Sequence, residues 1–498
     1  MKDISTDIGR KEWLEIILAI AVLIAATLLP TSIALVSTTI FFILFAFFKP
    51  FQSLVVLIPY VIFRSFFTEL NTGMKLIGDL ITFIVLIRLL LLNIKHWKTW
   101  FHFKKFEWFF FLFLIFGAVI GYLNGVSVAS IVFQVRTFII MYLLYYILSR
   151  SKLPRNFFVK LAWITVFSGF VLFVQGIVEK LSLRSMWMPE AWSDKVLSST
   201  NFVRIYGLVN NPNSLALVMF FAVSAAFFLR FVYQDGKYKV LLMISEVAFI
   251  GLLLLTLSRG TWISSFVFVL FFMLISRNWK ILKQMVLTFL VALILVYFPV
   301  NFGVILSQYL GVENETNGEV SSGGLSNRFK ETIDSETIEL MTQSGRLFYI
   351  KKGFEVLSDY PLTGAGFGTF GGSATLSYDS PIYEEYGIRS DIYGGKNFYS
   401  DNQYIQVIAE TGAIGVLLFA GFLLTMLWMF WKDRKSTFAQ YMFALWFATG
   451  FAGVVYNIWE LKVYTMFYFM LFAIYVATRN LYPMLELSKF ERELSDNK

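Results

Sequence analysis

Three arginines lie beside predicted membrane spans, where their positive charge needs an explanation. Arg204 precedes one span, Arg259 lies in a tight turn between two others, and Arg346 opens a helix in a long loop. All three are predicted on the outer side, although Lys and Arg normally gather in cytoplasmic loops. A guanidinium binds phosphate with two parallel hydrogen bonds and stays charged when partly desolvated. We therefore expect an anion site, although a snorkelling anchor or an ion pair with acidic loop residues would also explain each arginine singly.

A fourth arginine lies inside an apolar run. Arg136 belongs to the segment IVFQVRTFII, and a charge within the membrane is costly unless it faces the bundle interior or a wet cavity. Two interpretations stay open. Arg136 either contacts the ligand or forms a structural pair with one of three acidic residues, which are Glu246, Glu69 and Glu107.

Asp401 is the candidate catalytic carboxylate. It lies where the long loop re-enters the membrane, in the segment SDNQYIQVIAETG. A carboxylate at the mouth of a span can accept a proton from a hydroxyl, and the same group can cap the helix that begins there. No histidine is predicted on the outer side to serve as a base, because His96 and His102 both fall in a predicted cytoplasmic loop.

Composition identifies the elements that must position these residues. Hydrophobic residues make up 57% of the chain and charged residues 15%, against about 25% charge in soluble domains. Apolar runs of about twenty residues recur, and each is long enough to cross a hydrocarbon core of about 30 Å. The backbone must then be helical, because unsatisfied polar groups are costly in lipid. The predicted fold class is an all-α polytopic membrane protein, with no cysteine for disulfides or thiolate metal sites.

Hydrophobic periodicity predicts about fourteen transmembrane helices. The third is interrupted by Pro59 and Arg64 and is the one that could be re-entrant. The predicted spans are 13–30, 32–48, 51–67, 76–94, 106–124, 127–148, 160–178, 213–233, 240–257, 261–276, 284–300, 407–431, 439–457 and 461–478.

Basic loops set the predicted orientation, with both termini cytoplasmic and the loops 179–213 and 301–404 outside. The net charge of +9 therefore reflects topology and gives no case for nucleic-acid binding. The predicted parts are a bundle of about eleven spans, one long extracytoplasmic loop, three last spans and a cytoplasmic tail. Their boundaries are 1–300, 301–404, 405–480 and 481–498.

Two amphipathic helices are expected in the long loop. Residues 329–341 have helical spacing, and residues 313–324 before them are acidic, rich in Gly and Ser, and predicted mobile. The second helix could lie in the plane of the lipid headgroups or pack on the span ends, and we prefer the packed position. Its expected apolar stripe is Leu347, Ile350, Phe354 and Leu357, and a bend rich in Pro and Gly follows at 359–366.

Four short motifs occur in order between Arg204 and Gly415. They are NPNSLA at 211–216, SRG at 258–260, GR at 345–346 with DYPLTGAG at 359–366, and DNQY at 401–404 with ETG at 410–412. With the long outer loop late in the chain, these motifs resemble the O-antigen ligase / Wzy polymerase family of bacterial polysaccharide assembly. The resemblance implies a GT-C-like bundle acting at the outer face of the plasma membrane.

The resemblance also implies an activity and site residues. Its members act as inverting glycosyltransferases without metal or cofactor, using an undecaprenyl-diphosphate-linked oligosaccharide as donor. Arg204 and Arg259 would neutralise the departing diphosphate, and Asp401 would orient or deprotonate the attacking hydroxyl. The implied substrate-binding residues are Arg346, Arg136, Asn211, Asn213, Asn402, Tyr404 and Glu410. Membrane lipids and a chain-length regulator protein are the other implied partners.

Three functions remain open from the sequence. In the ligases of this family a histidine usually stands where this chain has Asp401, and the difference favours a polymerase of the capsule or teichuronic-acid type. The first alternative is a ligase that moves finished glycan to an acceptor. The second, of another class, is a flippase or transporter for lipid-linked oligosaccharides, although paired halves typical of transporters are not evident.

Overall fold

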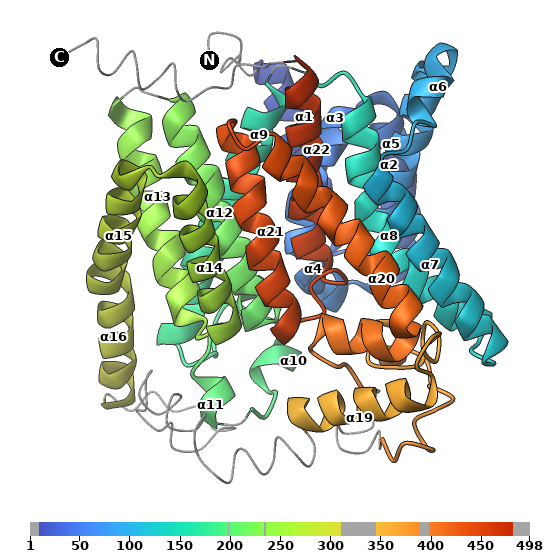
Figure 1. Cartoon of the computed structure of the whole chain (residues 1–498). Coiled ribbons are helices and arrows are strands. Elements are labelled where there is room, and N and C mark those ends of the chain that lie inside the picture. The colour runs from blue at the N-terminus through green and yellow to red at the C-terminus, as the bar shows by residue number, and fades with distance from the viewer. Residues whose placement is uncertain are drawn as a thin grey trace. The chain divides into compact units, whose positions relative to one another are not determined.

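The computed structural model describes residues 9–154, 156–197, 199–233, 236–309, 345–388 and 398–481, and within these ranges every regular element is a helix (Figure 1). The predicted helix at 329–341 and the predicted mobile segment at 313–324 lie outside the described residues. In the described part, ten helical segments are long and apolar enough to cross a membrane. The prediction of an all-α polytopic membrane protein is therefore confirmed. The ten segments are α2 (Thr31–Phe48), α7 (Lys105–Leu123), α8 (Val128–Arg150), α9 (Phe157–Leu181), α12 (Pro212–Val232), α13 (Gly236–Leu255), α14 (Arg259–Ser276), Trp279–Leu306, α20 (Gln403–Lys432) and α21 (Thr437–Val455).

The other four predicted spans correspond to helices that are bent or have a shorter apolar stretch. Three are α1 (Arg10–Ala26), α5 (Ile77–Leu92) and α22 (Lys462–Leu481), whose apolar stretch is Lys462–Ala477. The fourth is the pair α3 (Pro50–Ile62) and α4 (Arg64–Leu70), which bends by 73° next to the interruption expected from the sequence. The total of fourteen spans stays a prediction.

Short helices connect these long ones. The segment Trp279–Leu306 consists of α15 (Trp279–Ala292), the π-helical turn η4 (Leu293–Tyr297) and most of α16 (Phe298–Tyr309). The remaining elements are η1 (Thr72–Met74), η2 (Ile94–His96), α6 (Trp97–Trp100), α10 (Glu190–Ser193), α11 (Ser199–Phe202), η3 (Gly207–Val209), α19 (Arg346–Asp359) and η5 (Ala374–Leu376).

The chain forms two compact units. The first comprises residues 1–95, 147–262 and 278–328, and the second comprises 96–146, 263–277 and 329–498. In the first unit, α9, α12 and α13 pack against one another. Glycines on α9 allow this close approach, because a Cβ at Gly169 would lie 2.9 Å from the Ala222 side chain and one at Gly176 would lie 2.8 Å from Leu252.

In the second unit, α7 packs along α20 through aromatic rings, including Phe110 and Phe422 at 5.1 Å between centroids. Gly117 and Gly121 open a notch on α7 that receives Phe367 from the loop. The Phe367 backbone N–H donates to the Gly117 carbonyl at 2.9 Å. The loop therefore reaches down to the side of a membrane helix.

The helix α20 is broken at Gly412, whose φ of 54° and ψ of −161° are not helical. The Pro361–Gly366 segment fills the break. The backbone N–H groups of Ala413 and Ile414 donate to Pro361 and Leu362, while those of Ala365 and Gly366 donate to Ala409 and Glu410, at 2.7–3.0 Å. A break inside a candidate membrane span requires such partners, because lipid offers none. The predicted bend rich in Pro and Gly is thus the segment that completes α20.

The helix α19 packs on the first turns of α20, as expected (Figure 1). Its buried residues are Tyr349, Gly353 and Val356. The predicted stripe is wrong, because Leu347 and Phe354 are 44% and 52% exposed. Gly353 determines which face of α19 is buried. A Cβ at Gly353 would lie 2.3 Å from the Ile405 side chain, so α20 can pack there only because Gly353 has no side chain.

Candidate functional site

Arg204 belongs to the first unit, and its guanidinium is held between two helices. Its Nε donates to the backbone carbonyl of Thr256, after the end of α13, at 3.0 Å. Its Nη2 donates to Oδ1 of Asn213, in the first turn of α12, at 2.7 Å. These two contacts fix the orientation of the guanidinium.

The starts of α12 and α14 meet at the same place. Asn211 caps α12, because its Oδ1 accepts from the backbone N–H groups of Asn213 and Ser214, each at 2.9 Å. The hydroxyl of Ser258 donates to Oδ1 of Asn213 at 2.9 Å, and Arg259 follows as the first residue of α14. Helix N-termini favour anions. The first unit therefore gathers two of the predicted arginines and both predicted asparagines of this region.

A buried carboxylate that the sequence analysis missed fixes the backbone next to Arg204. Oε1 of Glu179 accepts from Arg184 Nη1 at 2.9 Å and from the Tyr206 N–H at 3.0 Å, and Oε2 accepts from the Gly207 N–H at 2.7 Å. Arg184 also lies over the Tyr206 ring, 4.4 Å from its centroid. Glu179 simply follows an apolar run in the sequence, so no local signal revealed this role.

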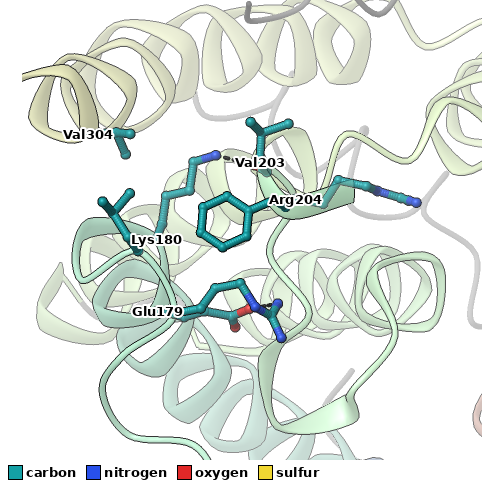
Figure 2. A pocket seen from close by; sticks show the side chains of 8 residues that line it. Glu179, Lys180, Val203, Arg204 and Val304 are labelled. Carbon is teal, nitrogen blue, oxygen red and sulfur yellow. Dashed lines mark hydrogen bonds and ion pairs between the residues drawn. The ribbon is translucent and has the colours of Figure 1, made fainter. Parts of the chain in front are cut away.

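A cavity of about 20 Å³ lies beside this carboxylate, lined by Lys180, Val203, Arg204 and Val304 among others (Figure 2). The Lys180 amine donates to the Val203 carbonyl, and Figure 2 shows the Arg204 guanidinium pointing away from that amine. A space of this size holds about one water molecule. The cavity is therefore too small for a sugar or a diphosphate.

Asp401 and Arg346 meet in the second unit. Arg346 Nη2 lies 3.4 Å from Asp401 Oδ2, and the two side chains are 46% and 47% exposed. Partial burial raises the pKa of the Asp401 carboxyl above its ordinary value, and the nearby Arg346 guanidinium acts in the opposite direction. Such half-exposed pairs contribute little to stability. Both groups are therefore accessible to a ligand.

Helix capping at this point belongs to Asn402 and not to Asp401. Oδ1 of Asn402 accepts from the backbone N–H groups of Tyr404 and Ile405, at 3.0 and 3.1 Å. Asp401 itself has a φ of 49°, in the left-handed region that Asp tolerates better than most residues. The capping alternative for Asp401 is thus wrong. Its carboxylate contacts Arg346 and remains available to accept a proton.

Two other predicted substrate residues have structural contacts instead. The Tyr404 hydroxyl donates to the Gly450 carbonyl at 2.6 Å. Glu410 is fully buried, and its Oε1 accepts from the backbone N–H groups of three consecutive loop residues at 2.9–3.2 Å, which are Gly368, Thr369 and Phe370. We therefore assign Glu410 to holding the loop in place of the predicted substrate contact.

A second buried carboxylate, Glu460, was also missed. It accepts from Gln134 Nε2 at 2.7 Å and from the Ser373 N–H at 2.6 Å, and burial raises its pKa. Nearby, the Ser400 hydroxyl donates to Oδ1 of Asn457 at 3.0 Å, and Asn457 Nδ2 donates to the Gly371 carbonyl. This network holds the residue that precedes Asp401.

Arg136 lies on α8 in the second unit, with its guanidinium 5.8 Å from the centroid of the Phe133 ring. Glu246, one of its predicted partners, pairs with Arg230 at 3.0 Å, and the partner of Arg136 stays a prediction. Another predicted partner, Glu107, is bound by the Tyr142 hydroxyl and the Lys104 N–H. Among the described residues, no cluster of three or more His, Cys, Asp or Glu side chains could hold a metal ion.

Residues 244–420 match a family model described as O-antigen ligase. This region is similar to the O-antigen ligase domain. It begins within α13 and includes Arg259, Arg346, Asp401 and the break in α20, while Arg204 and the α12 asparagines precede it. No curated protein matches the chain. The domain supports membership of the O-antigen ligase / Wzy family, whose members are membrane enzymes that transfer glycosyl groups.

The O-antigen ligase domain contains residues from both compact units. Arg204 and Arg259 belong to the first unit, and Arg346, Asp401 and Arg136 belong to the second. That the arginines of the two units meet at one membrane face stays a prediction.

Proposed function

We propose that this protein is a polymerase that joins undecaprenyl-diphosphate-linked glycan repeat units on the outer face of the bacterial plasma membrane. The observation that carries the proposal is the placement of Arg204, oriented by Asn213 and Thr256 where α14 begins with Arg259. Oriented guanidiniums beside helix N-termini form a site for a diphosphate. Both termini lie in the cytoplasm in this proposal.

The chemistry is a displacement at the anomeric carbon of the donor sugar. The oxygen of an acceptor hydroxyl forms a bond to that carbon, and the bond from the carbon to the diphosphate oxygen breaks. The diphosphate leaves with the electron pair, and Arg204 and Arg259 neutralise its growing charge. Asp401 accepts the hydroxyl proton. Attack from the face opposite the leaving group inverts the anomeric configuration, and no metal ion takes part.

Arg346 has two roles in this scheme. Its Nη2 lies 3.4 Å from Asp401 Oδ2, and its charge opposes the rise that burial causes in the pKa of that carboxyl, which favours the ionised form of the base. Its exposed guanidinium is also available to a phosphate oxygen, because a half-exposed ion pair is readily exchanged for a ligand contact.

A ligase is the second candidate, and the description of the matching family favours it. Deletion of the gene separates the two functions on one gel of lipid-linked glycans. Loss of a polymerase leaves single repeat units on the lipid carrier, whereas loss of a ligase leaves long chains there. Accumulated long chains would refute the polymerase proposal.

Complementation of the deletion then tests the residues. Arg259→Gln and Asp401→Asn should fail to restore polymer at normal membrane abundance of the protein. The matched controls are Arg434→Gln and Asp379→Asn, which alter exposed side chains and should restore it. Polymer of normal length from the Asp401 variant would remove the proposed base.

A further inference from the structure

We propose that Asn457 is a positioning residue that sets the direction of the Asp401 carboxylate. Asn457 is fully buried and lies in the connection between α21 and α22. The inference rests on the proposed function, because the direction of this carboxylate matters only if Asp401 accepts a proton from a substrate hydroxyl. It deepens that function, since it assigns the placement of the base to a residue outside the matched region 244–420.

The Asp401 carboxylate depends on its neighbours for its position. Its φ of 49° lies in the left-handed region, which residues other than glycine seldom adopt. Such conformations persist where the surrounding structure over-determines them, and they cluster at active sites. The contact with Arg346 at 3.4 Å is half-exposed, so it restrains the carboxylate only weakly. The residues on both sides of Asp401 must therefore set its direction.

The α21–α22 connection holds the chain before and after Asp401. Before it, the Ser400 hydroxyl donates to Oδ1 of Asn457 at 3.0 Å. After it, the Gln403 N–H donates to the Tyr456 carbonyl at 3.2 Å. Ser400 and Gln403 are both buried, where hydrogen bonds are stronger than in water. Two consecutive residues of the connection thus hold the two sides of the strained residue.

The Asn457 amide also joins this segment to the loop. Its Nδ2 donates to the Gly371 carbonyl at 2.9 Å, and the Ser400 N–H donates to the same carbonyl at 3.0 Å. The loop and the Ser400 segment are in direct contact, because a Cβ at Gly371 would lie 2.6 Å from the Ser400 Cβ. Only a side chain with an acceptor and a donor side by side makes both contacts of Asn457. Removal of the amide should therefore let Ser400 shift, and Asp401 with it.

The experiment measures the initial rate of glycosidic-bond formation by the purified full-length protein in nanodiscs. The substrate is a synthetic undecaprenyl-diphosphate-linked repeat unit. Asn457→Ala should lower kcat about tenfold or more, because a displaced base slows the chemical step. KM should change by less than about twofold, because the residues proposed to contact the diphosphate are untouched.

The pH profile separates positioning from a loss of folded protein. If Asn457→Ala moves the Asp401 carboxyl out of its present surroundings, the pH at which the rate falls to half of its maximum should shift. A smaller amount of active protein scales the whole profile and leaves that midpoint in place. A lowered rate with an unchanged midpoint would therefore overturn the proposal, and so would a wild-type kcat.

A matched control removes another buried asparagine. Asn71 is 4% exposed, and its Nδ2 donates to the carbonyls of Ala26 and Leu29 at 3.0 and 2.7 Å. Asn71→Ala should lower the unfolding temperature but leave kcat and the pH midpoint of the folded protein unchanged. If Asn457→Ala is unfolded or too slow to assay, Ser400→Ala takes its place, because it removes the same hydrogen bond from the other side.

Failure of the proposed function gives a different result from failure of this inference. If the wild type forms no product, or if Asp401→Asn is as active as the wild type, the proposed function or its base falls, and the inference falls with it. If the wild type is active and Asp401→Asn is not, the unchanged kcat or midpoint described above rejects the role of Asn457 alone.

Discussion

A Cβ added at Gly364 should disrupt the join between the loop and the broken helix α20. Gly364 has a φ of 67°, and its Cβ would lie 2.3 Å from the Thr411 nitrogen and 2.4 Å from the Glu410 carbonyl carbon. The backbone conformation alone costs about 1–2 kcal/mol for an L-residue. Because the clashing atoms are backbone, the segment must also move away from α20.

The cost of that movement follows from the hydrogen bonds that flank the glycine. The Ala365 and Gly366 N–H groups donate to Ala409 and Glu410 at 2.9 and 2.7 Å. Loss of two backbone hydrogen bonds costs roughly 2 kcal/mol, and more where no water replaces them. Gly364→Ala should therefore destabilise the protein by about 3–4 kcal/mol in total.

A matched glycine isolates the packing contribution. Gly387 has a φ of 63° and no heavy atom within 4 Å of a would-be Cβ, so Gly387→Ala carries the backbone cost alone. Thermal unfolding of both variants in the same detergent gives the comparison, and amide hydrogen exchange at residues 362–371 reports local opening. Equal destabilisation by the two substitutions would refute the account of how α20 is completed.

Three further predictions concern the site. Glu179→Gln should lower the stability of the protein by several kcal/mol, because it leaves the buried Arg184 without its carboxylate partner, and it should also weaken lipid-diphosphate binding. An unchanged unfolding temperature would contradict the structural role of Glu179. The polymerisation rate should decline as pH falls through the raised pKa of Asp401, because protonation removes the base. Arg346→Gln should shift this decline to higher pH, because it removes the charge that opposes the rise in that pKa. A shift to lower pH would contradict the interaction of Arg346 with Asp401. Asn402→Ala should cost about 1 kcal/mol through loss of the cap while Asn402→Asp costs little, and equal unfolding midpoints for the two would show that the cap is unimportant.

The membrane helices were predictable because lipid imposes length and continuous apolarity, which are visible in the sequence. Each predicted span has a helix in the structure, including the one bent beside Arg64. The face of α19 was mistaken because exposed Leu347 and Phe354 resemble a buried stripe. Burial there depends on Gly353, whose missing side chain admits α20 and gives no hydrophobic signal.

The polar site was predictable in part. Arginines near span ends are unusual enough to be noticed, and Arg204, Asn211, Asn213 and Arg259 are brought together in the first unit. The supporting carboxylates were not predictable, because their partners are set by tertiary structure. Gln134 and Glu460, for example, are separated by 326 positions in the chain. Single buried acids carry no spacing pattern from which a partner could be inferred.

The most direct test of the central claim is a reaction of purified protein with a synthetic undecaprenyl-diphosphate-linked repeat unit in metal-free buffer. The account predicts a ladder of longer lipid-linked glycans from the wild type and from Asp379→Asn, and unreacted substrate with Asp401→Asn. A ladder of equal length from Asp401→Asn, or none from the wild type, would contradict it.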